Sequence, residues 1–229
     1  MIGKKIHDLC KKLLPLNRSL TGNGNRQTLK ILKGICKNLK IKEIPSGKKV
    51  FDWTIPDEWN AKNAWIRCPN GKKIAIYKKN NLHLVSYSKK MNAKMSLDQL
   101  EKHLHYIKEQ PNAIPYVTSY YNKNWGFCIS YNEKKKLKKG TYEIFIDSTF
   151  SKGSLTYGEI LIPGIEKKEI FLSTYICHPS MANNELSGPT VTIFLAKWLM
   201  EQKRRYSYRI IFIPETIGSI SYLQNILKS

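Results

Sequence analysis

The sequence has few acidic residues and no paired-cysteine motif, and each absence narrows the class of protein. Its 229 residues include 17 Asp and Glu against 39 Lys and Arg, which gives a formal net charge of +22. The five cysteines are widely scattered, and no two of them form a CxxC pair. The sequence therefore indicates neither a disulfide framework nor a thiolate zinc site.

Long apolar segments are also absent. The apolar-rich stretch Thr190–Leu199 is about ten residues long, whereas a membrane-spanning helix needs roughly 20. The first residues, MIGKKIHDLCKK, contain neither the apolar stretch nor the small-residue cleavage site of a signal peptide. With 41% apolar and 24% charged residues, the chain is typical of a folded globular protein. We therefore expect a soluble, cytoplasmic protein with no membrane contact.

The basic surplus has two interpretations. A charge of this size is the usual electrostatic footprint of a nucleic-acid-binding protein. However, Lys far outnumbers Arg and Asn and Ile are also abundant, which is typical of a composition bias spread over the whole surface. No aromatic-rich nucleic-acid signature accompanies the charge. We expect no nucleic-acid partner, and binding through the basic surface remains the third hypothesis for function.

Hydrophobic periodicity divides the chain into three blocks. Residues 1–44 repeat apolar side chains at helical spacing, and residues 47–150 form short strand-like segments. A capping box at Ser96 predicts one helix within this middle block, continuing to Ile107. Residues 151–229 read as strand, helix, strand, helix, which predicts a parallel βαβ unit with a right-handed crossover.

A run of basic residues, KKKLKK at 134–139, lies between two predicted strands of the middle block. Runs of like charge are usually solvated, so we interpret it as an exposed hairpin loop. A specific anion site is the alternative interpretation.

Two short polar stretches follow the predicted parallel strands directly. His178 comes after the strand Glu169–Cys177, and Glu215 comes after the strand Arg209–Ile213. Because ligands of open α/β sheets bind at the carboxyl ends of the strands, we expect both side chains at one edge of the sheet. Imidazole and carboxylate are ligand types of catalytic zinc. The alternatives are that His178 bonds a loop carbonyl and that Glu215 caps the last helix.

Five stretches, in order along the chain, carry a specific resemblance. They resemble a bacterial aminopeptidase-like family that is often associated with polysaccharide-biosynthesis loci. Its members resemble the co-catalytic two-zinc aminopeptidases, carry an inserted β-rich domain near the start, and often end in a winged helix. The stretches are LLPLNRSLTGNGNRQTL (13–29), FDWTIPDEWN (51–60), GSLTYGEILIPG (153–164), STYICHPSMANNELSGP (173–189) and IPETIGSISYL (213–223).

The resemblance implies roles for individual residues. His178 corresponds to the first zinc ligand, and Asn184 falls where the two-zinc aminopeptidases have a bridging aspartate. Glu215 falls in the glutamate motif that supplies the general base or a further ligand. An amide is a weaker ligand than a carboxylate, so the adjacent Glu185 is an alternative donor. The implied cofactor is zinc, as one or two ions.

The resemblance also implies the architecture. We expect an α/β fold in which residues 1–46 and 151–229 form a partial zinc-aminopeptidase-like sheet, parallel or mixed, with helices. Residues 47–150 would be the inserted β-rich, α+β domain. The related enzymes take a further Asp and His from a second half that is absent from these 229 residues, which implies a C-terminally shortened member. Its sheet would have an open edge, so a partner chain or self-association is expected to cover it.

The implied function is that of a zinc-dependent, aminopeptidase-like hydrolase. A metal-activated water would attack the carbonyl of a peptide or amide small-molecule substrate, with Glu215 as the catalytic base. The shortened chain is expected to have an incomplete active site and little activity alone. The alternative is a non-catalytic interaction or scaffold protein that retains the inserted domain.

Overall fold

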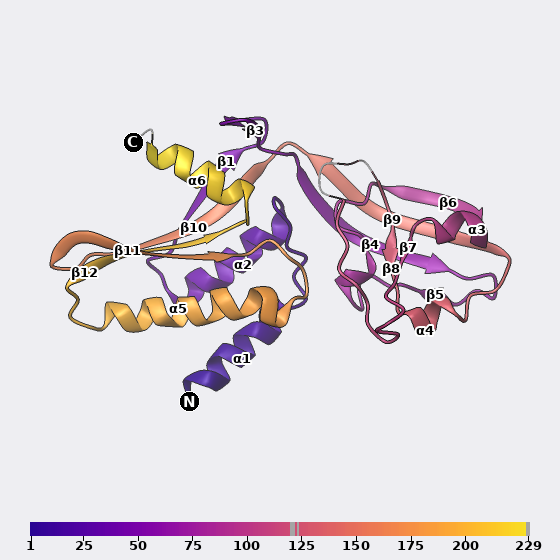
Figure 1. Cartoon of the computed structure of the whole chain (residues 1–229), viewed down its shortest axis with the longest axis horizontal. Helices are drawn as coiled ribbons and strands as arrows, with labels where there is room; N and C mark the ends of the chain where they lie inside the picture. The colour runs from indigo at the N-terminus through magenta and orange to yellow at the C-terminus, as the bar shows by residue number, and fades with distance from the viewer. Residues whose placement is uncertain (120–121, 123, 228–229) are drawn as a thin grey trace. The chain divides into compact units, whose positions relative to one another are not determined.

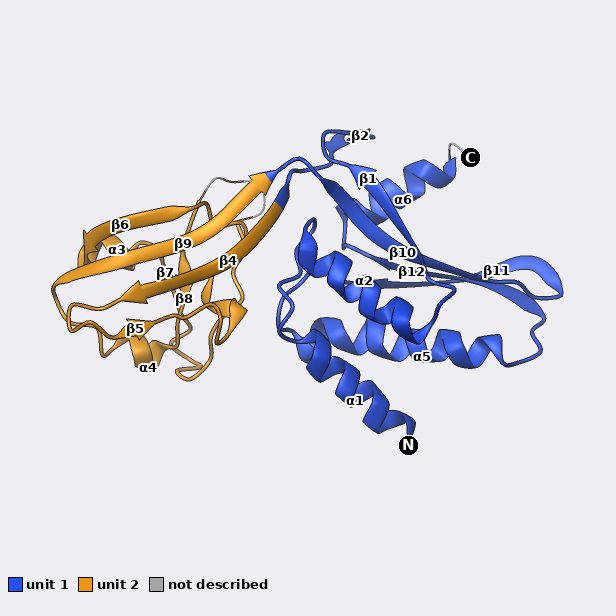
Figure 2. Ribbon diagram, turned by 180° about the vertical axis from the view of Figure 1, so that it is seen from behind, with its two compact units in different colours: residues 1–58, 151–229 blue, residues 59–150 orange. Residues whose placement is uncertain are grey.

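The computed structural model describes residues 1–119, 122 and 124–227, which form two compact units. Unit 1 contains residues 1–58 and 151–229, and unit 2 contains residues 59–150 (Figure 2). The sequence prediction begins the insert at residue 47. In the structure, the hairpin of β2 (Lys49–Val50) and β3 (Trp53–Thr54) belongs to unit 1, where β2 contacts the last helix.

Unit 1 is built around a mixed four-stranded sheet with the strand order β1-β10-β12-β11. The β1–β10 and β10–β12 pairs are antiparallel, whereas β11 and β12 are parallel and joined through α5. The predicted α/β class and parallel βαβ unit are therefore confirmed. The remaining elements of unit 1 are α1 (Ile2–Leu13), α2 (Asn23–Ile35), β1 (Lys40–Pro45), β10 (Ser154–Ile162), β11 (Glu166–Tyr175), a π-helical turn (Ala182–Leu186), α5 (Ser187–Met200), β12 (Tyr206–Ile213) and α6 (Ile217–Leu227).

Three helices cover one face of this sheet and α6 covers the other (Figure 1). The apolar stripes that predicted α1 and α2 become buried there, as Leu13 and Leu29 are inaccessible to solvent. They pack with Ile193 of α5 and Phe212 of β12 in one core. Each such side chain contributes about 1.5–3 kcal/mol when fully buried, so this core holds the carboxyl ends of β11 and β12 in place.

A network of charged side chains lies on the α6 face of the sheet. The Glu159 carboxylate accepts hydrogen bonds from Arg209 at 2.5 Å and from the Tyr222 hydroxyl at 2.9 Å. Lys42 is a third donor to the same carboxylate, and Arg209 also binds Glu169 at 2.6 Å. Burial by itself would raise the pKa of Glu159, but these hydrogen bonds outweigh it and lower the pKa below its ordinary value of 4.5.

This lowered pKa predicts acid sensitivity. A carboxylate whose pKa is depressed by folding stabilises the native state above its unfolded pKa, and this contribution is lost as the pH falls through the folded pKa. We expect Glu159→Gln to lose less free energy of unfolding than the wild type between pH 7 and pH 3, measured by urea titration. The exposed Glu201→Gln is the matched control, and an identical pH dependence of all three proteins would contradict the prediction.

Unit 2 is built around a second sheet, in the order β5-β4-β9-β6. Its predicted long helix is wrong: the capping box at Ser96 is present, but α3 ends at Glu101. Leu104 and His105 instead form a short strand parallel to Phe127 and Cys128, because tertiary pairing outweighs the helical spacing. The unit contains β4 (Glu58–Arg67, which starts in unit 1), β5 (Lys73–Ile74), a 3₁₀ turn (Asn81–His83), β6 (Met91–Ser96), α3 (Leu97–Glu101), β7 (Leu104–His105), β8 (Phe127–Cys128), α4 (Tyr131–Lys134) and β9 (Thr141–Ser151).

Within the part of the chain that the structure describes, no helix has the length and apolar character needed to cross a bilayer.

Candidate metal centre

His178 and Glu215 meet at the carboxyl ends of two neighbouring strands. Tyr175 of β11 is in register with Ile213 of β12, so the residues that follow the two strands leave the sheet side by side. The His178 Nε2 atom lies 3.3 Å from the Glu215 Oε2 atom. The His178 side chain is largely buried, with 12% of its surface exposed, whereas that of Glu215 is 50% exposed. The pair therefore presents its donor atoms at an accessible edge.

The other side of the His178 imidazole is held by Glu185. The Glu185 Oε2 atom lies 2.9 Å from His178 Nδ1 and also accepts a hydrogen bond from the His178 backbone N–H. Its second carboxylate oxygen, Oε1, accepts a hydrogen bond from Arg18 Nε at 2.6 Å. Both side chains of the Arg18–Glu185 pair are fully buried. The Glu185 carboxylate is thus fixed beneath the imidazole and paired with the Arg18 guanidinium.

A tight loop between α1 and α2 brings Arg18 into the interior. Arg18 Nη1 donates to the Leu13 carbonyl at 2.6 Å, at the end of α1. Gly24 of α2 packs directly on this loop, since a Cβ atom there would lie 2.0 Å from the Asn17 carbonyl oxygen. The first of the five stretches that carry the family resemblance, 13–29, therefore positions the cation of the site. Nothing in its spacing had indicated that Arg18 would be buried.

Asn184 lies in the π-helical turn that also carries Glu185. The Tyr175 hydroxyl donates to the Asn184 backbone carbonyl at 2.7 Å and lies 3.3 Å from its side-chain Oδ1. The Asn184 side chain remains exposed, so it stays a predicted ligand rather than an observed member of the His178–Glu215 pair. The Tyr175 and His178 rings also meet edge to face, with centroids 5.6 Å apart.

The two strand ends are also sites of backbone strain. Ser180 (φ 48°) and Thr216 (φ 57°) both adopt the left-handed conformation that costs free energy in residues other than glycine. Ser180 follows His178 by two residues, and Thr216 follows Glu215 directly. Strain of this kind concentrates at functional sites, which fits the position of both residues beside the candidate ligands.

Cys177, His178 and Glu185 have donor atoms within 4.8 Å of one another and could in principle hold a metal ion. We assign Cys177 a packing role instead. Burial and the nearby carboxylates, Glu185 first, raise the pKa of the Cys177 thiol. Its sulfur accepts a hydrogen bond from the Glu215 backbone N–H at 3.3 Å. Because Arg18 and the His178 N–H already engage Glu185, the donor atoms that would remain for a metal ion are His178 Nε2 and the Glu215 carboxylate.

This donor set fits zinc. Zinc binds histidine nitrogen and carboxylate oxygen at about 2.0–2.2 Å with tetrahedral angles, so two ligands of one ion lie about 3.3–3.5 Å apart. The 3.3 Å separation of His178 Nε2 and Glu215 Oε2 meets this requirement. A metal-binding histidine usually donates its other ring N–H to a carboxylate, as His178 Nδ1 can to Glu185.

The other four histidines lie elsewhere in the structure. His83 Nδ1 lies 2.8 Å from the Cys128 carbonyl oxygen, and His103 Nδ1 lies 3.1 Å from that of Trp125. Burial lowers the pKa of His105, which lies on β7. His7 is exposed on α1. None of these four is brought to the His178–Glu215 pair.

Solved structures with the same fold show which class of fold this chain has. The zinc aminopeptidase BSAP from Bacillus subtilis matches with a TM-score of 0.60 at 11% identity, covering 93% of this chain and 60% of BSAP. The peptidase M28 precursor from Shewanella amazonensis matches with a TM-score of 0.58 at 9% identity, covering 99% of this chain and 71% of that protein. At such identities the likeness establishes the fold, and this fold is aminopeptidase-like.

A family model and two relatives of higher sequence identity show the family to which this chain belongs. The family described as domain of unknown function DUF4910 matches residues 7–228, and the chain belongs to it. A Clostridium acetobutylicum relative, provisionally named a polysaccharide biosynthesis protein with an aminopeptidase-like domain, is 49% identical over 221 residues. A crystal structure of a provisionally named peptidase from that organism has a TM-score of 0.96 at 48% identity, covering 99% of this chain. The chain spans about half the length of these relatives, 51% and 53% respectively.

Proposed function

We propose that this chain carries the histidine-bearing part of a zinc-dependent, aminopeptidase-like hydrolase site. His178 and Glu215 would hold the metal, and Asn184 would be a weaker third ligand. The observation that carries the proposal is the 3.3 Å His178–Glu215 pair, backed by the buried Glu185 carboxylate. A zinc ion bound there would polarise a substrate carbonyl and lower the pKa of a bound water.

Glu185 and Glu215 would have different roles at this site. Glu185 would keep the Nδ1 proton on His178, so that Nε2 offers its lone pair to the metal. The half-exposed Glu215 carboxylate could accept a proton from water as well as bind metal, which is the role the resemblance implies for it. The substrate class we propose is a peptide or amide small molecule. The relative's name suggests polysaccharide biosynthesis as the setting.

Zinc binding tests this proposal directly. Chelator-treated full chain, titrated with zinc chloride, should bind the ion by calorimetry and unfold at a higher temperature. At a free concentration of 100 times Kd, the expected gain is about 2.7 kcal/mol in the free energy of unfolding. His178→Ala should remove both effects, and the exposed His7→Ala should retain them. Equal zinc binding by His178→Ala and the wild type would refute the assignment.

A non-catalytic interaction role is the second candidate function. It is favoured by Asn184, an amide where the resemblance implies a bridging carboxylate, and by the two donor atoms that the described residues bring together. A wild-type chain that binds no zinc in the titration above would support this candidate over the hydrolase.

We also propose that a further polypeptide covers the β11 edge of the sheet. β11 is an outer strand whose exposed side chains include Ile170 and Phe171 as well as charged residues, and the Phe171 ring lies 6.0 Å from that of Tyr222 on α6. β1, the other outer strand, has no large exposed apolar side chain. Exposed apolar sheet edges pair readily with another strand. The occupant we propose corresponds to the half of the Clostridium relative that this chain does not match.

The proposal for the β11 edge predicts a complex that can be measured. A purified polypeptide spanning the unmatched half of the Clostridium relative should form a 1:1 complex with the chain in sedimentation velocity. Phe171→Glu should weaken that complex by about tenfold or more, because a charge would be buried at the strand contact. The control Ile2→Glu alters an equally exposed apolar side chain on α1. Self-association of the chain without the added polypeptide, or equal effects of the two variants, would contradict the proposal.

A further inference from the structure

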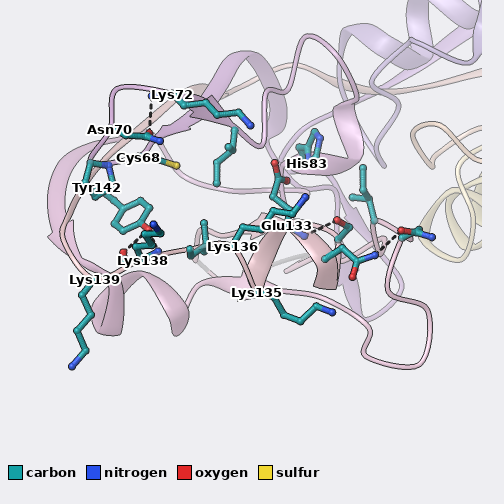
Figure 3. A pocket seen from close by; sticks show the side chains of 17 residues that line it. Cys68, Asn70, Lys72, His83, Glu133, Lys135, Lys136, Lys138, Lys139 and Tyr142 are labelled. Carbon is teal, nitrogen blue, oxygen red and sulfur yellow. Dashed lines mark hydrogen bonds between the residues drawn. The ribbon is translucent and has the colours of Figure 1, made fainter.

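Unit 2 contains an open cavity of about 1050 Å³ that lies far along the chain from the His178–Glu215 pair (Figure 3). One side is formed by the turn between β4 and β5, including Asn70 and Lys72. The other is formed by α4 and the basic run at 135–139. Cavities of roughly 300–1,000 Å³ hold ligands of drug size, so this one can take a ligand of several rings.

The wall of the cavity is strongly basic. Most of this charge comes from the basic run at 135–139, part of the segment for which the sequence favoured a solvated hairpin loop. Glu133 is the single carboxylate among the described lining residues, which also include five lysines. Lys134, just outside the lining, pairs with Glu101 at 3.0 Å, but none of the five makes an ion pair with a described residue. The five are Lys72, Lys135, Lys136, Lys138 and Lys139.

This charge distribution favours an extended anion. Cations that lack a neighbouring carboxylate raise the local potential and attract anions, most strongly inside a concave surface. Lys72 and Lys136 come from two separate segments of the wall. Lys135 and Lys139 extend away from the hollow (Figure 3), where they could reach a ligand longer than the cavity. A single small anion could not engage all of these positions, so the fitting ligand carries several separated negative groups.

Amide side chains add hydrogen-bonding capacity between the charges. Asn70 Oδ1 accepts from the Lys72 N–H at 3.1 Å, which leaves its amide nitrogen as a donor. Asn132 Nδ2 donates to Asn112 Oδ1 at 2.7 Å, which leaves the Asn112 nitrogen and the Asn132 oxygen. Such donors and acceptors are suited to the hydroxyl groups of a sugar.

The same wall lacks a platform for nucleic-acid bases. Single-stranded nucleic acids stack their bases on exposed aromatic side chains. Tyr142 and His83 supply the aromatic rings among the described lining residues, and Tyr142 is 1% exposed. The Tyr142 hydroxyl donates to the Lys138 carbonyl at 2.8 Å, and His83 Nδ1 lies 2.8 Å from the Cys128 carbonyl oxygen. Tyr142 is therefore buried, and the half-buried His83 ring is held by a hydrogen bond to the backbone.

We propose that this cavity binds an acidic oligosaccharide, meaning a chain of several sugars that carries carboxylate or phosphate groups. The lysines of the two walls would pair with the separated charges, and the amides of Asn70, Asn112 and Asn132 would bind sugar hydroxyls. Unit 2 would then be a carbohydrate-binding module. This inference does not depend on the zinc site, since no residue is shared.

Calorimetric titration of the full chain tests the proposal with defined probes. Tetragalacturonate, which has four carboxylates, should bind, and binding should weaken as sodium chloride rises from 50 to 200 mM. Maltotetraose, an uncharged tetrasaccharide, should bind at least tenfold more weakly. Lys72→Gln/Lys136→Gln should reduce the tetragalacturonate affinity at least tenfold. The control Lys89→Gln/Lys90→Gln removes the same charge from exposed lysines outside the cavity and should change it less than twofold.

Three results would each overturn the proposal. Equal weakening by the two double variants would show attraction by net charge alone. Pyrophosphate binding as tight as that of tetragalacturonate would show a simple anion site. A single-stranded oligonucleotide that outcompetes tetragalacturonate would identify a nucleic-acid surface instead. Far-UV circular dichroism of each variant, with a spectrum matching the wild type, separates lost binding from lost folding.

Discussion

Arg18→Ala is expected to destabilise the chain by roughly 3–5 kcal/mol, the usual cost of removing one partner of a buried ion pair. Glu185 would keep a carboxylate that is 1% exposed and no longer has a counter-charge. The Leu13 carbonyl would also lose its hydrogen bond from Arg18, which weakens the junction between α1 and the loop. Urea unfolding followed by tryptophan fluorescence measures the loss. It is a large fraction of the 5–15 kcal/mol that stabilises a typical domain.

An exposed ion pair gives the matched control for this prediction. Arg205 Nε binds Glu166 at 2.6 Å, but the Arg205 side chain is 71% exposed. Pairs in such solvated positions contribute only about 0–1 kcal/mol, so Arg205→Ala should have a small effect. If Arg18→Ala and Arg205→Ala changed the free energy of unfolding equally, the buried pair would not have the role assigned to it.

Glu185→Gln is expected to lower the zinc affinity of the chain by about 10–100-fold, the range measured when a residue behind a metal ligand is changed. The side chain keeps its size and can still accept a hydrogen bond from Arg18. However, its new amide group offers a donor where the His178 N–H and the imidazole Nδ1–H both need an acceptor. The imidazole is then poorly oriented toward the Glu215 carboxylate.

Calorimetric zinc titration of the folded variant measures this effect, with Glu201→Gln as the exposed control. A merely structural role for Glu185 would lower stability and leave the zinc affinity of the remaining folded protein unchanged. That outcome would contradict the positioning role. Loss of zinc binding in Glu185→Gln together with full retention in His178→Ala would contradict the whole assignment of ligands.

Much of the α/β unit is readable from the sequence because local patterns and burial agree there. The apolar stripes of α1 and α2 and the apolar run of β12 each match the burial that the structure shows. The near-continuous apolar run of β11 is typical of a strand covered on both faces, yet β11 is an outer strand that exposes Ile170 and Phe171. Helix and strand periods can be read in this way when one face of an element is buried. Unit 2 was less predictable. The spacing from Leu97 to Ile107 is helical, yet pairing of β7 with β8 ends the helix at Glu101.

The surroundings of His178 and Glu215 were likewise predictable only in part. His178 and Glu215 can be placed at one sheet edge from the sequence, since each directly follows a predicted parallel strand. Glu185 was considered only as a substitute ligand for Asn184. Its orientation toward Arg18 and the far side of the imidazole depends on the π-helical turn, which has no sequence signature as clear as a capping box. Arg18 lies 167 positions from Glu185, so no local pattern connects them.

The sequence by itself determined the α/β class, the order of strands and helices around His178 and Glu215, and the strong basic charge. These properties depend on side-chain type and on spacing along the chain. Only the tertiary structure decided that Arg18 is buried against Glu185, that β11 is an outer strand of the sheet, and that the lysines of 135–139 line a cavity with Lys72. Each of these depends on segments far apart in the chain, and their contacts are selected by packing of the whole unit rather than by local preference.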